Sequence, residues 1–342
     1  MKRWMIALPM LLAGACTEFE SIEEACKGSV PGDRDASAEA IRVFERLGCY
    51  RRYAGLGQAR LSPPISRAVQ NHIGYLEENV SFEDWWINQT ESVFVEQQGR
   101  VGFTGAQAVD RFDFEGYETD NQSIQTWSVI ALFQDNQQPP ETYIDNQIHH
   151  PLYRDALLAP GWQAGSYAEG TLEPTFRIGY LEAALFLPSG QKAFKPVSYP
   201  IQDQTGVPVA WNNCVTRDGI SFGIDPGEPF DDLDITTGYP VSFTFGSDDT
   251  RGGNNPLDIQ VQRTRFLGPE GDVPHGVVLP AVYPTFGPNT STVSLIPLDP
   301  LLPDTEYYVE IDVSWISRQN LTQALTFTTR ASDETAGLCL LP

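Results

Sequence analysis

The longest amphipathic pattern of the chain follows Ser62. Four side chains recur there at spacings of four, three and four residues, which is the period of a helix with one buried face: Ile65, Val69, His72 and Leu76. Ser62 suits an N-cap because its hydroxyl can accept a hydrogen bond from a free N–H, and Pro63 suits the first turn because its missing N–H is not needed. The pattern predicts an amphipathic helix. On spacing alone, its histidine is a core residue with a satisfied hydrogen bond.

The rest of residues 37–195 alternates between helical and extended patterns. A first helix begins between Asp35 and Ser37 and has an apolar face that includes Phe44 and Leu47. Further helical patterns occupy 106–114 and the stretch from 140 to 158, and extended or continuously apolar patterns occupy 92–96, 124–133 and 165–187. This alternation predicts a three-layer α-β-α arrangement.

From residue 239 onward the pattern is all-β. Short alternating segments, separated by turns rich in Gly, Pro, Asn and Asp, occupy 239–245, 257–261, 291–295, 307–313 and 325–329. Such strands at such spacing predict a β-sandwich over 239–342. Residues 196–238 have many prolines, glycines and aspartates but little periodicity, so we expect a linker or extension there.

The first sixteen residues have the pattern of an export signal. Lys2 and Arg3 precede an apolar run that is too short to span a bilayer. Residues 13–16, Ala-Gly-Ala-Cys, resemble a bacterial lipobox, which implies that Cys16 becomes a lipidated N-terminus; ordinary signal cleavage nearby is the alternative. Thr17 is not the aspartate that retains lipoproteins in the inner membrane. We therefore expect an exported protein anchored at the outer membrane or cell surface, or otherwise periplasmic or extracellular.

The composition of the chain restricts the kinds of partner that the protein is expected to bind. The net charge is −23 and the pI is about 4.4, which argues against nucleic acid and against adsorption on an anionic membrane. Membrane contact is expected only through the lipid anchor, from which an acidic arm, 17–36, leads to the first folded domain. The acidic run within 225–234 offers oxygen ligands for calcium, or it is a solvated loop.

Cysteine usage fits export. Apart from Cys16 there are four cysteines, an even number that suggests two disulfides in an exported chain: Cys26, Cys49, Cys214 and Cys339. Three pairings are open. The division into domains favours Cys26 with Cys49 and Cys214 with Cys339.

Several motifs resemble known families. The run RRYAGLGQARLSPPISRAVQNHIGYL resembles the opening of a CAP-superfamily domain (cysteine-rich secretory, antigen five and pathogenesis-related one proteins). The GFTG at 102–105, with Arg111 and Tyr117, and the segment 150–160 resemble later motifs of bacterial members, while PLLPDT at 300–305 resembles a turn of bacterial immunoglobulin-like domains. The resemblance implies an α+β chain: a CAP-like α-β-α sandwich over 37–195, followed by an immunoglobulin-like sandwich.

The CAP resemblance also implies a cleft with two histidines and two acidic residues, which in some members binds a divalent metal. This sequence keeps His72 and places Glu96 at one acidic position. Tyr153 stands at the place of the second histidine, with His150 a few residues before it, either reaching the cleft or lying at a helix junction. Residues 126–128 lack the second carboxylate.

These departures favour binding or structure over catalysis. A metal site needs several converging ligands, and the chain has neither G-x-S-x-G nor HExxH. We expect a non-enzymatic surface protein whose degenerate cleft binds a small ligand, lipid, glycan or protein, or serves only as a structural module. The alternative is a CAP-type hydrolase or a zinc- or calcium-binding protein that uses His72 and Glu96, with Tyr153 as proton donor.

Overall fold

The computed structural model describes residues 21–27, 32–33, 35–88, 90–117, 124–133, 139–173, 176–186, 196–212, 236–245, 259–279, 291–314, 320–332 and 335–336. The expectations for Cys16, Cys214, Cys339 and the acidic run within 225–234 lie outside these residues. Within them, no helix combines the length and the apolar character needed to cross a membrane.

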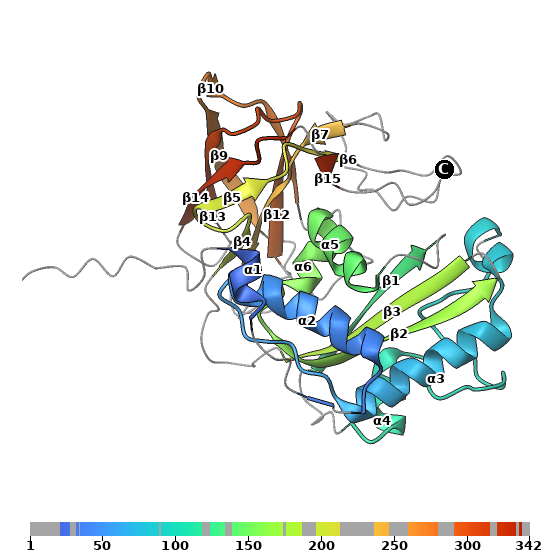
Figure 1. Ribbon diagram of the computed structural model, residues 1–342. Helices are drawn as coiled ribbons and strands as arrows, with labels where there is room; N and C mark the ends of the chain where they lie inside the picture. The colour runs from blue at the N-terminus through green and yellow to red at the C-terminus, as the bar shows by residue number, and fades with distance from the viewer. Residues whose placement is uncertain are drawn as a thin grey trace, which may run out of the picture.

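The chain is mixed α/β (Figure 1). Its helices are α1 (Ile22–Ala25), α2 (Ala38–Tyr53), α3 (Pro63–Asn79), the π-helical turn η1 (Glu83–Ile87), α4 (Ala108–Phe114), α5 (Glu141–His149) and α6 (Pro151–Leu157). Its strands are β1 (Ile124–Phe133), β2 (Trp162–Glu173), β3 (Phe176–Phe186), β4 (Val197–Tyr199), β5 (Gln204–Val207), β6 (Ala210–Asn212), β7 (Thr236–Gly238), β8 (Val241–Phe245), β9 (Gln260–Gly268), β10 (Gly271–Asp272), β11 (His275–Val278), β12 (Ser291–Pro297), β13 (Glu306–Ser314), β14 (Leu321–Thr329) and β15 (Thr335–Ala336).

The first unit is built on an antiparallel sheet in the order β1-β3-β2, with helices on both faces (Figure 1). Successive side chains of a strand point to opposite faces. On β3, Leu181, Ala183 and Leu185 therefore join the core with α2, α5 and α6. Ile178, Tyr180 and Ala184 join a second core cluster with α3 and α4. Glu182 is buried on this second face, as the only charged side chain in the segment 178–186.

The local signals at the helix starts are only partly realised. α2 begins directly after Ser37, at the end of the range expected for its start, and the Ser37 hydroxyl caps it by accepting a hydrogen bond from the Ala40 N–H at 3.1 Å. α3 begins at Pro63, but the Ser62 hydroxyl makes no capping bond, so that detail of the prediction is wrong. The Ser62 N–H instead donates to the Gly165 carbonyl at 3.3 Å, which ties the start of α3 to β2.

The second unit contains two larger sheets, in the orders β10-β9-β13-β14-β5 and β11-β12-β8-β4, whose apolar faces share one core. Residues 196–212, the first part of the stretch 196–238 for which we expect a linker or an extension, contribute strands to this unit. Here β4 pairs antiparallel with β8, and β5 pairs parallel with β14. The reason is burial, since Val197, Tyr199 and Val207 all lie in the shared core. A small sheet, β15-β6-β7, stands beside them.

The two units meet around α6. Arg154 is 1% exposed, and its guanidinium donates to the carbonyls of Tyr199 at 3.1 Å and Pro240 at 2.9 Å, both in the second unit. The same guanidinium lies 4.9 Å and 5.1 Å from the ring centroids of Tyr199 and Tyr239. Asp155 accepts hydrogen bonds from Thr244 and Thr292 of the second unit. Polar groups of the first unit are thus completed by partners in the second.

A disulfide joins Cys26, at the end of α1, to Cys49 of α2, with 4.5 Å between the Cα atoms. The pairing expected for these two cysteines is therefore formed. It fixes the short α1 against the first core cluster, where Ala25 is buried.

Candidate functional site

His72 lies on the inner face of α3 and is fully buried. Its Nδ1 is 2.9 Å from Oε1 of Glu96, and its Nε2 is 2.9 Å from the carbonyl oxygen of Val93. A carbonyl can only accept, so Nε2 carries a hydrogen and donates it to Val93. Both ring nitrogens are therefore occupied by partners within the protein.

Glu96 lies in an irregular loop, not in the strand expected over 92–96. The loop turns back on itself because the Glu96 N–H donates to the Ala106 carbonyl at 3.1 Å. Its carboxylate then accepts from the N–H groups of Thr104 at 2.6 Å and Gly105 at 3.2 Å. The GFTG segment of the sequence thus wraps around a buried carboxylate, and Gly105 allows this because a Cβ there would lie 2.6 Å from Cβ of Asp110.

The electrostatics keep Glu96 ionised. Burial alone would raise the pKa of its carboxyl, but the hydrogen bonds from His72 and Thr104 and the charge of Arg111 outweigh that effect, and the pKa lies below its ordinary value. The pKa of Arg111 shifts in the opposite direction. Burial would lower the pKa of its guanidinium, but Glu182 above all more than compensates, and the pKa is raised.

A chain of buried polar and charged groups runs from α3 to the sheet. Arg111 of α4 is fully buried, lies 4.0 Å from Oε1 of Glu96 through its Nε, and donates through Nη2 to Glu182 of β3. Glu182 also accepts from the Ser128 hydroxyl of β1 at 3.2 Å. We call His72, Glu96, Arg111 and Glu182 the buried charge cluster. It links α3, the 93–105 loop, α4 and β3 from the inside.

Aromatic rings close the cluster on two sides. The Tyr180 ring centroid lies 4.7 Å from that of His72, and the Tyr75 ring stacks nearly parallel to the imidazole, with 6.2 Å between centroids. The Tyr75 hydroxyl accepts from the Gln97 N–H at 2.9 Å, which ties the loop to α3 a second time.

Two of the four candidate residues expected from the sequence come together, and two do not. His72 and Glu96 are hydrogen-bonded to each other. Tyr153 packs against the first core cluster, on the other face of the sheet from His72. His150 lies beside it with 4.8 Å between ring centroids, and burial raises the pKa of Tyr153 to about 12. Tyr153 lies away from His72 because α5 and α6 cover the face of the sheet opposite α3, and His150 lies at the junction of α5 and α6, one of the two places expected for it.

Arg111 and Glu182 were the functional-type residues that sequence reasoning missed. In the sequence Arg111 stands out only as part of the motif that follows GFTG. The signal for Glu182 in the sequence is its isolation, as the single charged residue of the otherwise apolar segment 178–186. A buried charge in such a strand needs a partner of opposite sign, and Arg111 supplies it.

The chemistry open to this cluster is limited by enclosure. His72 and Glu96 have 0% and 1% of their surfaces exposed, and neither lines the hollow beside Ser66 and Ser166 or the one beside Leu267 and Tyr308. No group of three or more metal-binding side chains converges within the described part of the chain. In this arrangement the cluster holds elements together, and the His72 and Glu96 side chains are not exposed to solvent.

Comparison with models of known protein families finds no match for this chain, and comparison with curated proteins finds no similar sequence. Function is therefore inferred from the chain's own residues.

Proposed function

We propose that this protein is an exported, lipid-anchored and non-enzymatic module of the cell surface. In this proposal the first unit is a degenerate CAP-like domain, and the second is an immunoglobulin-like sandwich. The observation that supports the proposal is the burial of His72 and Glu96. The hydrogen-bonding groups of both side chains already have partners within the protein. The module binds a ligand elsewhere on its surface or acts as a spacer.

The sequence supports the surface location. The apolar run before Ala-Gly-Ala-Cys and the acidic arm behind it fit a chain tethered through Cys16. A lipid chain inserted in the bilayer supplies the membrane affinity that a protein of net charge −23 lacks. We therefore place the folded part outside the membrane, held at its surface by the anchor.

The hydrolase alternative is disfavoured by geometry. General acid–base work needs a titratable pair within hydrogen-bond reach of the substrate. His72 and Glu96 form such a pair, but both side chains are closed off, and the proton donor assigned to Tyr153 lies across the sheet.

The test compares the wild type with His72→Gln, and uses His275→Gln of β11 as a matched control. We expect no stoichiometric zinc or calcium in the purified wild type and no hydrolysis of p-nitrophenyl acetate, whereas His72→Gln unfolds at a lower temperature than His275→Gln. Metal at one equivalent, or turnover, that disappears only in His72→Gln would defeat the proposal. The anchor is tested separately, since Cys16→Ser should leave the membrane fraction.

A further inference from the structure

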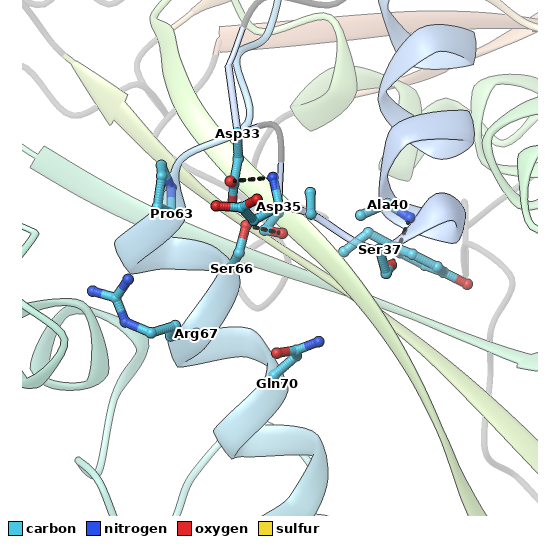
Figure 2. A pocket seen from close by; sticks show the side chains of 11 residues that line it. Asp33, Asp35, Ser37, Ala40, Pro63, Ser66, Arg67 and Gln70 are labelled. Carbon is cyan, nitrogen blue, oxygen red and sulfur yellow. Dashed lines mark hydrogen bonds between the residues drawn. The ribbon is translucent and has the colours of Figure 1, made fainter.

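A hollow of about 200 Å³ lies at the edge of the sheet in the first unit, away from the buried charge cluster. Ser166 and Tyr167 of the edge strand β2 form part of its lining. Figure 2 shows Ser66 and Gln70 of α3 on one side of the hollow and Ser37 of α2 on the other. Two helices, a strand and the segment before α2 therefore enclose one space.

The charges around this hollow are mixed. Asp33 and Asp35 contribute two carboxylates from the segment before α2. Arg67 contributes a guanidinium, although Glu115 already accepts from its Nε at 2.7 Å and from its Nη2 at 2.8 Å. The N-termini of α2 and α3 add partial positive charge at the same place. The carboxylates disfavour an anionic ligand, and the positive groups disfavour a cationic one, so a neutral ligand is favoured.

The hydrogen-bonding capacity of the lining is mixed as well. The Ser66 hydroxyl accepts from Ser166 at 3.0 Å and keeps its own hydrogen to donate. The Asp33 carboxylate accepts from the Asp35 N–H through Oδ1 at 2.9 Å, which leaves its second oxygen available. The exposed amide of Gln70 supplies both a donor and an acceptor. A hydroxyl group both donates and accepts, so a ligand with several hydroxyls matches this lining.

The size of the hollow and the apolar part of its lining also fit a small ligand with several hydroxyls. A volume of 200 Å³ corresponds to about seven water molecules at roughly 30 Å³ each, which is smaller than the usual pocket for a drug-sized ligand. Pro63 is exposed and offers apolar surface against which carbon-bound hydrogens can pack, and the buried Tyr167 and Ala40 lie in the lining beside it. We propose that the hollow binds a single neutral sugar unit.

This inference rests on the proposed function, because it supplies the ligand of a binding module. Its failure would leave the enclosure of His72 and the Cys16 anchor untouched, so the two outcomes can be told apart. The hollow lies on exposed side chains of α3, and changing them leaves the buried core intact.

The experiment is saturation-transfer-difference NMR followed by calorimetric titration, on the full mature chain. The probes are glucose and N-acetylglucosamine, with inorganic phosphate and ethylammonium as charged counter-probes. We expect at least one sugar to bind, and Gln70→Ala to weaken that binding by about five-fold or more. Gln163→Ala, an exposed glutamine of β2 outside the hollow, is the matched control and should bind like the wild type.

Three results would overturn the proposal. The first is the absence of saturation transfer from both sugars at about 10 mM, a concentration that detects even weak binding. The second is tighter binding of phosphate or ethylammonium than of either sugar. The third is equal weakening by Gln70→Ala and Gln163→Ala, since that would place the sugar elsewhere.

Discussion

At the scale of single residues, the buried charge cluster shows how a charge is kept inside a protein. Glu96 accepts hydrogen bonds from two backbone N–H groups and faces His72, while Arg111 lies between Glu96 and Glu182. Removing one member of a buried pair leaves an uncompensated charge, which costs far more than a surface ion pair contributes. Each member is therefore a sensitive site for stability.

The first prediction concerns acid. The pKa of Glu96 is depressed in the folded state, so its contribution to stability is present above the unfolded pKa and is lost as pH falls through the folded value. The wild type should therefore lose stability below about pH 4.5 more steeply than Glu96→Gln. Urea unfolding at a series of pH values measures this. Glu78→Gln, an exposed glutamate of α3, should keep the wild-type slope.

The second prediction concerns Arg111 and Glu182. Arg111→Met should cost about 3–5 kcal/mol, because it leaves Glu182 buried without its cation. Glu182→Leu should also lower the stability, because it leaves Arg111 buried without its carboxylate partner. In the double variant the two losses should not add, and a coupling of about 1–3 kcal/mol in a double-mutant cycle is the expected result. Simple additivity would mean that the contact between Arg111 and Glu182 contributes nothing.

At the scale of elements, the 93–105 loop is held by its own backbone and by a carboxylate rather than by strand pairing. Gly105 is the tightest point, because an added Cβ would meet Cβ of Asp110 at 2.6 Å and the Arg111 nitrogen at 2.7 Å. The start of α4 therefore leaves no room for a side chain at this position.

The third prediction follows from that close approach. Gly105→Ala should push the loop away from Glu96, destabilise the protein by about 1–3 kcal/mol and speed amide exchange over residues 96–105. Gly74→Ala is the control, because a Cβ there meets nothing within 4 Å and lies inside α3. That change should stabilise by up to about 1 kcal/mol. Unchanged exchange in Gly105→Ala would show that the loop adapts without cost.

At the scale of the whole molecule, polar groups of the two units form hydrogen bonds with each other at the junction. Arg154 is a buried cation whose hydrogen bonds go to carbonyl and hydroxyl oxygens on both sides, with two tyrosine rings against it. Separating the units would remove the partners that the second unit supplies to this guanidinium. Asp155 would likewise lose its hydrogen bonds from Thr244 and Thr292. The units should therefore unfold together.

The fourth prediction tests this coupling. Arg154→Met should lower the stability by about 3–5 kcal/mol and split a single calorimetric transition into two, because the interface carbonyls lose their donor. Arg265→Met, at an exposed arginine of β9, should leave one transition at nearly the wild-type temperature. Two transitions already present in the wild type would contradict the shared junction.

The fifth prediction concerns pH at the same junction. Burial lowers the pKa of His149 to about 3, with the charge of Arg154 adding to the effect, and its Nδ1 lies 2.9 Å from the Tyr239 hydroxyl. Below about pH 6.5 the imidazole of His149 is therefore protonated in the unfolded chain, whereas in the folded chain it stays neutral. Stability should fall from about pH 6.5 downward, by at most about 1.4 kcal/mol per pH unit. His149→Asn should flatten this slope between pH 6.5 and 4.5, above the range in which Glu96 titrates.

Local patterns in the sequence determined the elements. The four-three-four spacing in α3 and the alternation in strands such as β13 each act over a few residues, and each is realised in the structure. The cysteine count and the division into domains also led to the Cys26–Cys49 pairing. These features were predictable because the period of a pattern depends on neighbouring residues alone.

Tertiary structure decided what the elements do together. It placed Tyr153 across the sheet from His72, brought Arg111 to Glu182 over 71 residues of chain, and drew residues 196–212 into the sheets of the second unit. A local pattern says which face of an element is apolar, but not which partner covers it. Whether His72 faces a cleft or a sealed interior was set by the 93–105 loop and the sheet that close around it, through contacts that no spacing within α3 encodes.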